Sequence, residues 1–386
     1  MLGIFVVASA LWALLHAYVA VRLLAPSRLG RVGRTLCALL FALLALASPQ
    51  VFTVDQLLRE PYNQVFRWAA WIYIGGFTTL FALVVARDLI WLGLRLSERW
   101  RAPVLPTDPE RRKFVLRTTG KVALGVTAAV TAWGARAARR VPEVVEVEVP
   151  IDGLPREFDG YHIVQLSDVH VGETIDKDFI LPIIEQVTSL SPDLIALTGD
   201  LVDGSVDKLR ADITPFAYLR APDGVLCVTG NHEYYSGAEA WCARFRELGL
   251  TVLNNAHIAL ERAGKRLVVA GVTDLREGKH VPGHTSDPAL ALEGAPAHQT
   301  RILLAHQPRS IAVAKTLGYH LQLSGHTHGG QFFPWNLFIG LVQPLGSGLA
   351  KFDRTWLYVN RGTCYWGPPN RAGVPAEITS LRLRRA

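Results

Sequence analysis

The sequence predicts an N-terminal α-helical transmembrane module followed by an α/β (α+β) domain. Three observations carry this prediction. Half of the 386 residues are hydrophobic, while only 19% are charged, below the roughly 25% usual in soluble domains. Long uncharged runs recur in the first hundred residues, and beyond Val144 short β-rich runs alternate with helical stretches. The composition therefore excludes a disordered chain and disfavours a wholly soluble one.

Charge is distributed unevenly along the chain. Residues 1–140 hold 18 Lys and Arg against 6 Asp and Glu, a balance of 18 − 6 = +12, and residues 141–386 have 22 − 27 = −5. A nucleic-acid-binding domain would need a basic face of its own. The acidic C-terminal part therefore predicts no nucleic-acid partner.

Three uncharged runs, residues 1–21, 35–54 and 68–86, predict three transmembrane helices within a module spanning residues 1–100. Each has about the 20 residues that a helix needs to cross a bilayer. His16 is the only ionisable side chain inside them, and transporters usually need more intramembrane polar chemistry. The module is therefore expected to be a multi-pass anchor in the cell (inner) membrane.

Residues 101–143 read as a basic linker that contains a further uncharged segment, 122–135. Its 14 residues are short for a span and normal for an export signal. Arg111 and Arg112, followed by Lys113, Phe114 and Val115, are similar to a twin-arginine export motif. The basic loops at 22–34 and 87–121 should face the cytoplasm. If 122–135 spans, the C-terminal domain is extracytoplasmic, which we favour; Arg136, Arg139 and Arg140 favour the cytoplasmic alternative.

Residues 144–386 predict one layered domain in which strands alternate with helices. About 245 residues suffice for one hydrophobic core. The expected strands are 144–151, 162–167, 194–199, 224–230, 266–272, 301–306 and 321–326. The expected helices are 177–190, 206–219, 237–248 and 308–317.

Polar residues follow five of these strands directly. They are Asp168 and His170; Asp200 and Asp203; Asn231, His232 and Glu233; His306; and His326 and His328. Loops at the carboxyl ends of strands are where such domains build their sites. Carboxylate and amide oxygens mixed with imidazoles suit Mn, Fe, Zn or similar divalent ions. No thiolate takes part, which excludes a structural zinc site.

This order of motifs, D-x-H, G-D-x-x-D, G-N-H-E, a lone His and G-H-x-H, resembles the calcineurin-like metallophosphoesterases. The resemblance runs from about residue 145 to the C-terminus. It implies a β-sandwich flanked by helices. The G-H-T-H-G-G-Q form at 325–331 and the tail from Tyr358 look like the branch of membrane-linked or twin-arginine-exported bacterial phosphoesterases.

The resemblance also implies a role for each motif residue. Two divalent metal ions are expected, one held by Asp168, His170 and His328 and the other by Asn231, His306 and His326, with Asp200 bridging both. His232 is expected to face the substrate as a catalytic residue, because strain prevents it from binding metal beside Asn231. Asp203 would orient His232.

The expected function is hydrolysis of a phosphodiester or pyrophosphate bond by a metal-activated hydroxide, with a lipid-linked phosphate ester among the candidate substrates. The first alternative function is that of an enzyme similar to the UDP-2,3-diacylglucosamine pyrophosphatase of lipid A synthesis, acting on the cytoplasmic face of the membrane. The second is an inactive scaffold or sensor with this fold. Gly204 stands where the family's protein phosphatases have an Arg, which disfavours protein phosphatase activity. No protein partner is predicted. The apolar run 332–345 fits either a lipid entrance or ordinary packing.

Overall fold

The computed structural model describes residues 2–54, 58–59, 61–98, 100, 105–106, 108–296 and 299–386. The chain divides into two compact units. A membrane unit contains residues 1–136 together with 367–372, and a catalytic unit contains residues 137–366 and 373–386. Parts of the predicted linker, residues 99, 101–104 and 107, lie outside the described residues.

The membrane unit consists of long helices, as predicted. They are α1 (Leu2–Leu24), α2 (Arg31–Ala47), α3 (Tyr62–Ser97) and α4 (Pro109–Ala138). Three stretches of the described chain are long and apolar enough to cross a membrane: Val6–Leu24, Arg31–Phe52 and Tyr62–Ser97. They overlap the predicted spans 1–21 and 35–54 and contain the predicted span 68–86. In the interior, His16 is buried, with Nε2 2.7 Å from the Tyr73 hydroxyl and its ring stacked on Phe77.

The uncharged segment 122–135 is not an isolated short helix. It lies within the 30 residues of α4, whose first half carries Arg111, Arg112, Lys113, Arg117 and Lys121. These charges keep α4 out of the group of helices that length and composition alone allow to span.

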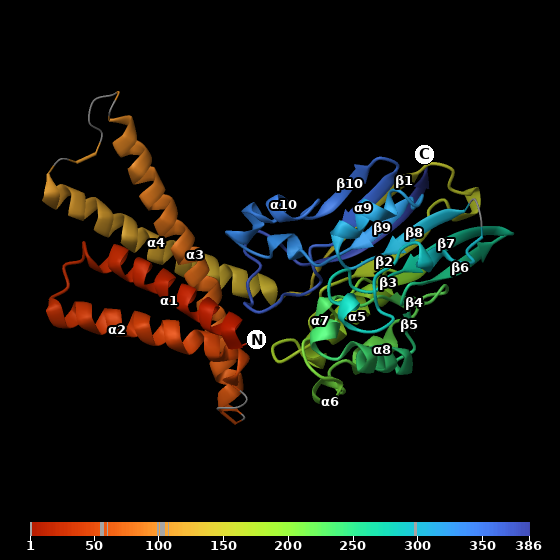
Figure 1. Cartoon of the computed structure of the whole chain (residues 1–386), viewed down its shortest axis with the longest axis horizontal. Helices are drawn as coiled ribbons and strands as arrows, with labels where there is room; N and C mark the ends of the chain where they lie inside the picture. The colour runs from red at the N-terminus through yellow and green to blue at the C-terminus, as the bar shows by residue number, and fades with distance from the viewer. Residues whose placement is uncertain are drawn as a thin grey trace. The chain divides into compact units, whose positions relative to one another are not determined.

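The catalytic unit contains two six-stranded sheets (Figure 1). The first has the order β1 (Glu143–Ile151), β12 (Glu377–Arg385), β2 (His162–Leu166), β3 (Leu194–Leu197), β4 (Val225–Cys227) and β5 (Thr251–Val252). The second has the order β10 (Gly348–Phe352), β11 (Thr355–Val359), β9 (Leu321–Ser324), β8 (Thr300–Leu304), β7 (Lys265–Gly271) and β6 (Ala256–Arg262). Strands β2 to β5 are parallel, and so are β7, β8, β9 and β11.

The two sheets share one apolar core, which confirms the expected β-sandwich. Its fully buried side chains come from both sheets and include Ile163, Leu194, Val269, Ile302 and Leu323. Every residue of β2 and β3 is buried, as expected for parallel strands covered on both faces.

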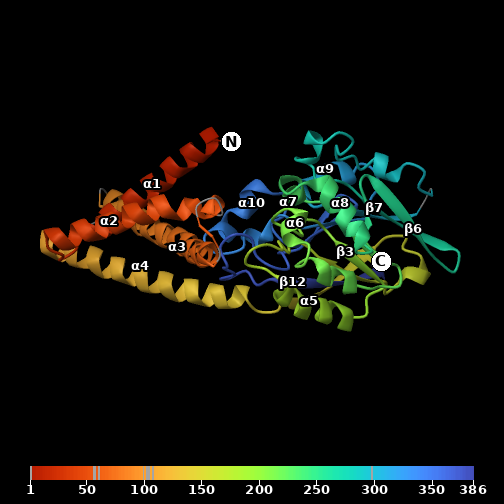
Figure 2. The ribbon, with the colours of Figure 1, turned by 90° about the horizontal axis from the view of Figure 1, so that it is seen from below.

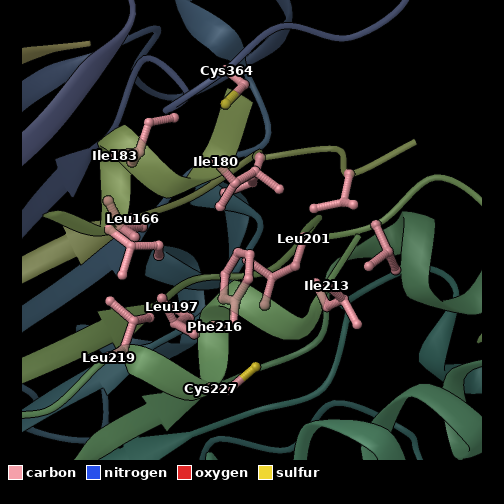
Figure 3. Packing of buried hydrophobic residues seen from close by; sticks show 14 of the residues in the cluster. Leu166, Ile180, Ile183, Leu197, Leu201, Ile213, Phe216, Leu219, Cys227 and Cys364 are labelled. Atoms are coloured by element: carbon pink, nitrogen blue, oxygen red, sulfur yellow. The ribbon is translucent and has the colours of Figure 1, made fainter. Parts of the chain in front are cut away.

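Helices cover the outer face of the first sheet. They are α5 (Lys177–Ser189) and α8 (Ala238–Glu247), with the short α6 (Val206–Leu209) and α7 (Asn231–Tyr235) beside them. Figure 3 shows this second core, where Leu166 and Leu197 of the sheet lie among Ile180, Ile183 and Phe216. The short helices α9 (Ile311–Ala314) and α10 (Ile339–Val342) belong to the second half of the unit.

Two predicted helices were wrong in extent. Residues 308–317 form only a 3-10 turn over Pro308–Ser310 and the single turn of α9. Residues 206–219 form only the single turn of α6 and a 3-10 turn over Thr214–Tyr218. Pro215 lies at the start of that 3-10 turn and has no N–H with which to continue an α-helix from the preceding turn.

Candidate metal centre

The seven predicted metal ligands follow five strands of the sandwich. Asp168 and His170 follow β2, Asp200 follows β3 and Asn231 follows β4 in the first sheet; His306 follows β8, and His326 and His328 follow β9, in the second. Because these strands are parallel within each sheet, their carboxyl ends lie at one edge. The structure brings six of these side chains into two groups with potential ligand atoms within 4.8 Å of one another, and a third such group, His170, Asp200 and His232, links the two.

The first group joins Asp168, His170 and His328. Nε2 of His170 lies 3.1 Å from Nε2 of His328, and the latter lies 3.4 Å from Oδ1 of Asp168. All three residues are buried. Two ring nitrogens and a carboxylate oxygen therefore converge on one point, as the ligands of a metal ion do.

The second group joins Asp200, His306 and His326. Nε2 of His306 is 3.1 Å from Oδ2 of Asp200, and Nδ1 of His326 is 3.2 Å from Nε2 of His306. The same Oδ2 of Asp200 lies 3.9 Å from Nε2 of His170 in the first group. Asp200 thus stands between the groups, where a carboxylate could bridge two ions.

Asn231, the seventh predicted ligand, lies beside Asp200. The backbone N–H of His232, the next residue, donates to Oδ1 of Asp200 at 2.8 Å. The side-chain oxygen of Asn231 is buried and has no hydrogen-bond partner among the described residues. A buried acceptor without a donor costs free energy unless something else, such as a cation, satisfies it.

Hydrogen bonds of His306 and Glu233 fix the loops around Asp200; of the residues involved, Thr198 was not singled out by the sequence. Nδ1 of His306 donates to the Thr198 carbonyl at 2.8 Å, which orients Nε2 toward Oδ2 of Asp200. Glu233 is buried and accepts the backbone N–H groups of Asp200, Leu201 and Gly230 at 3.0, 2.7 and 2.6 Å. Thr198 acts through its backbone carbonyl, which no side-chain motif could reveal.

The backbone of the predicted ligands is strained. Asp168, His170, Asp200, His326 and His328 have positive φ, from 50° to 70°. Such a conformation costs a non-glycine residue on the order of 1–3 kcal/mol, and residues of this kind cluster at functional sites. Five of the seven predicted ligands adopt it.

Two glycines allow backbone to approach the carboxylates closely. A Cβ at Gly230 would lie 2.2 Å from Oδ1 of Asp200. One at Gly325 would lie 2.2 Å from Oδ2 of Asp168 and 1.9 Å from Oγ of Ser167. No side chain fits in either place, so G-N-H-E and G-H-x-H need their glycines for space.

Burial and charge set the protonation of the cluster. Burial lowers the pKa of His170 to about 3 and that of His326 to about 4, so both rings are neutral, the form that binds a metal. Burial raises the pKa of Asp168 to about 6. At His306 burial opposes protonation, but Asp200 outweighs it and raises the pKa to about 10; His306 in turn holds the pKa of Asp200 below its usual range against the effect of burial.

His232 and Asp203 lie beside this cluster and contact each other. Nδ1 of His232 donates to Oδ1 of Asp203 at 2.6 Å, and Oδ2 of Asp203 lies 3.7 Å from Nδ1 of His170. Burial opposes charge on His232, but the hydrogen bond to Asp203 and nearby carboxylates raise its pKa to about 9. Asp203 thus contacts both the predicted catalytic histidine and a predicted ligand.

Two aromatic rings flank His232, and sequence reasoning missed this arrangement. The ring centroids of Tyr235 and Trp366 lie 5.3 and 5.4 Å from that of His232. Both rings are exposed, Tyr235 by 65% and Trp366 by 40%. Gln331 fixes the backbone of Trp366 at both its N–H and its carbonyl, at 2.8 and 2.9 Å. Arg361 pairs with Glu377 at 2.5 Å.

The donor set fits divalent metal ions. Oxygen and imidazole donors converge in two groups that Asp200 and His170 link, one amide oxygen is unsatisfied, and no thiolate lies in either group. This chemistry suits Mn, Fe or Zn.

Comparison with known proteins identifies the family to which the domain is similar. The calcineurin-like phosphoesterase family matches residues 161–330. Two proteins described as transmembrane protein with metallophosphoesterase domain are each 35% identical. The one from Danio rerio aligns over 80% of this chain and 71% of its own, and the one from Bos taurus over 89% and 80%.

A metallophosphoesterase of Campylobacter jejuni is 28% identical over 97% of this chain and 96% of its own. The relatives thus include animal as well as bacterial proteins, so the likeness is not confined to the bacterial branch that the motif suggested.

Proposed function

The chain belongs to the calcineurin-like metallophosphoesterases, and from that premise we propose that it is a membrane-attached hydrolase that cleaves a phosphodiester or pyrophosphate bond with two divalent metal ions. The observation that carries the proposal is the pair of ligand groups around Asp200. Asp168, His170 and His328 would hold one ion, His306, His326 and Asn231 the other, and Asp200 both.

Two such ions supply a nucleophilic water at neutral pH and neutralise charge on the phosphate group. The protein's own residues provide the rest. Asp203 fixes the ring of His232 through Nδ1, which leaves Nε2 as the ring nitrogen available to a substrate beside the ligands. With the pKa of His232 raised to about 9, Nε2 carries a proton at neutral pH and can donate it to the leaving oxygen.

The test is hydrolysis of bis(p-nitrophenyl) phosphate by the full-length protein, with and without added Mn²⁺, together with a count of bound metal. Asp200→Asn should abolish turnover and reduce bound metal from two ions per chain. His232→Ala should keep both ions and reduce turnover by about 10²- to 10⁴-fold, the usual contribution of a general acid. Turnover unchanged in both variants would refute the proposal.

The inactive scaffold or sensor remains the contrasting hypothesis. It predicts a folded protein that binds no metal and hydrolyses none of the model diesters. The presence of all seven expected ligands argues against it. Five of them have a strained backbone, and a bound ion would compensate for that strain.

A lipid-linked substrate has specific support in the catalytic unit. Five large apolar side chains between 335 and 342, shortly after the ligand His328, are exposed by 51–80%: Trp335, Leu337, Phe338, Leu341 and Val342. No charged residue occurs from 332 to 350. Exposed apolar patches of this kind mark interaction sites, and a bilayer is the apolar phase nearest a membrane-attached enzyme.

This substrate class is testable separately from the activity. Leu337→Ser with Leu341→Ser should raise KM for a phosphodiester embedded in mixed micelles and leave bis(p-nitrophenyl) phosphate hydrolysis unchanged. The matched control is Leu290→Ser with Val313→Ser, two exposed apolar residues elsewhere in the unit. Equal KM values in both double variants would leave a soluble substrate as the better assignment. Cleavage of a nucleotide-diphosphate lipid alone would favour the lipid A enzyme.

We also propose that α4 is a fourth crossing and that the catalytic unit is extracytoplasmic. Contacts within the membrane unit support this. A Cβ at Gly120 would lie 3.9 Å from Nη1 of Arg87, and one at Gly76 would lie 3.1 Å from Oγ1 of Thr131. The two contacts are eleven residues apart on each helix, and the residue numbers fall along α3, from 87 to 76, as they rise along α4, from 120 to 131. The helices therefore run antiparallel over about 16 Å, at 1.5 Å per residue.

Because α3 is a span that ends in the basic loop, α4 would start at the cytoplasmic surface and run back into the bilayer beside it. A reporter fused after Ala386 that is active on only one side of the membrane tests this. Activity outside the cytoplasm is expected. Activity inside it would limit the unit to three spans and favour the nucleotide-lipid substrate.

A further inference from the structure

The membrane unit contains a cavity of about 650 Å³ that plays no part in the proposed hydrolysis. Its lining residues come from the end of α1, the loop after it, the middle of α2 and the N-terminal part of α4. Figures 1 and 2 show the ribbons of these helices. Its walls are largely apolar, with Leu23 and Leu24 from α1, Leu40 and Phe41 from α2, and Leu124 from α4. Such apolar walls match a hydrocarbon chain in chemistry.

The remaining wall is cationic. Arg28, Arg117 and Lys121 line the cavity, and no Asp or Glu does. Among the residues that the structure describes, none of the three forms an ion pair, whereas the nearby Arg22 and Arg87 are both paired with Asp88 at 2.5 and 3.0 Å. Three cations beside apolar walls, with no Asp or Glu lining the cavity, favour an amphiphilic anion.

Unsatisfied polar atoms occur at the same place. Oγ of Ser27, another lining residue, is buried without a hydrogen-bond partner in the described chain. Nη1 of Arg87 is also buried and unpartnered, and lies 3.9 Å from the position of a Cβ on the lining residue Gly120. Each can donate to a phosphate oxygen.

We propose that this cavity binds an anionic phospholipid, with its phosphate headgroup between Arg28, Arg117 and Lys121 and an acyl chain along the leucines. The position is appropriate, because the first span ends at Leu24 and the second begins at Arg31, which puts the cations at headgroup depth. A neutral lipid would leave the three charges uncompensated. Free phosphate would leave the apolar walls bare.

The test is native mass spectrometry of the full-length protein from detergent, titrated with phosphatidylglycerol or phosphatidylcholine. Phosphatidylglycerol should bind saturably at one molecule per chain and raise the unfolding temperature. Phosphatidylcholine and inorganic phosphate should do neither. Arg117→Gln with Lys121→Gln should weaken phosphatidylglycerol binding at least tenfold, since each basic side chain near a membrane surface contributes appreciably to anionic-lipid attraction.

The matched control is Arg111→Gln with Lys113→Gln, two exposed cations on the same helix that do not line the cavity. Equal loss in both double variants would overturn the proposal in favour of diffuse attraction. Leu40→Trp tests the apolar wall with all charges intact, and unchanged affinity there would also overturn it. Stabilisation by inorganic phosphate as strong as by phosphatidylglycerol would reduce the site to a simple anion site.

Discussion

At the scale of single residues, a substitution of Asp203 can separate the role of His232 in proton transfer from the role of His170 in metal binding. Asp203 fixes His232 through Oδ1 at 2.6 Å and lies 3.7 Å from the ligand His170 through Oδ2. Asp203→Asn removes the charge that stabilises the protonated ring. We expect kcat to fall about 10- to 100-fold, as for other residues that orient a catalytic or ligating group, with KM little changed.

A double-mutant cycle checks this role. In a His232→Ala background, Asp203→Asn should lower kcat by less than about twofold, because residues that act as a unit are not additive. Asp207→Asn, on an exposed neighbouring carboxylate, is the control. A full additional loss in the double variant, together with weaker metal binding, would show that Asp203 acts through His170 instead.

Glu233 holds the ligand loops by their backbone. Both of its oxygens accept N–H groups, although burial raises its pKa to about 7. Glu233→Gln turns one acceptor into an N–H₂ donor that faces other donors. A buried donor left unpaired costs about 1–3 kcal/mol, so chemical denaturation should show a loss of that size, absent in the exposed Glu239→Gln. Full stability of Glu233→Gln would contradict this role.

At the scale of elements, the loop after β9 depends on a glycine for space. Gly325→Ala would put a methyl group 1.9 Å from Ser167 and 2.2 Å from Asp168, so β9 and β2 must separate at the ligands. We expect bound metal to fall by one ion per chain and turnover to drop at least 100-fold. Gly340→Ala in α10 meets nothing within 4 Å and should change neither quantity. Normal metal content in Gly325→Ala would show that the loop adapts.

These elements also show how much of the structure could be predicted from the sequence. Strands that end in Asp, Asn or His predicted a layered domain with polar side chains gathered at strand ends, because β-strand patterning and ligand chemistry are local properties. The β-sandwich and the role of each ligand came from the resemblance to the family. The left-handed backbone at Asp168 and Asp200 was not predictable, since only the assembled site over-determines it. The prediction of a helix over residues 206–219 was wrong because it did not take Pro215 into account. Trp366 lies beside His232 although 134 residues of chain separate them, so no local pattern predicts their contact.

At the scale of the whole molecule, the candidate ligands connect the two sheets. Asp168, His170, Asp200 and Asn231 come from the first sheet, and His306, His326 and His328 from the second. Each proposed ion takes ligands from both. A bound metal therefore acts as a cross-link at the edge of the sandwich as well as a source of catalytic charge, and its removal should be felt by the entire catalytic unit.

The size of that effect follows from linkage. A ligand present at 100 times its Kd stabilises the folded state by about 2.7 kcal/mol, and a unit of this length shifts by about 2–4 °C per kcal/mol. Chelation should therefore lower the catalytic unit's unfolding temperature by about 5–10 °C in calorimetry. The membrane unit holds none of the seven ligands, so its transition should stay in place. Asp200→Asn should unfold at the lower temperature with or without chelator, and a chelator effect that persists in that variant would place the stabilising ion elsewhere.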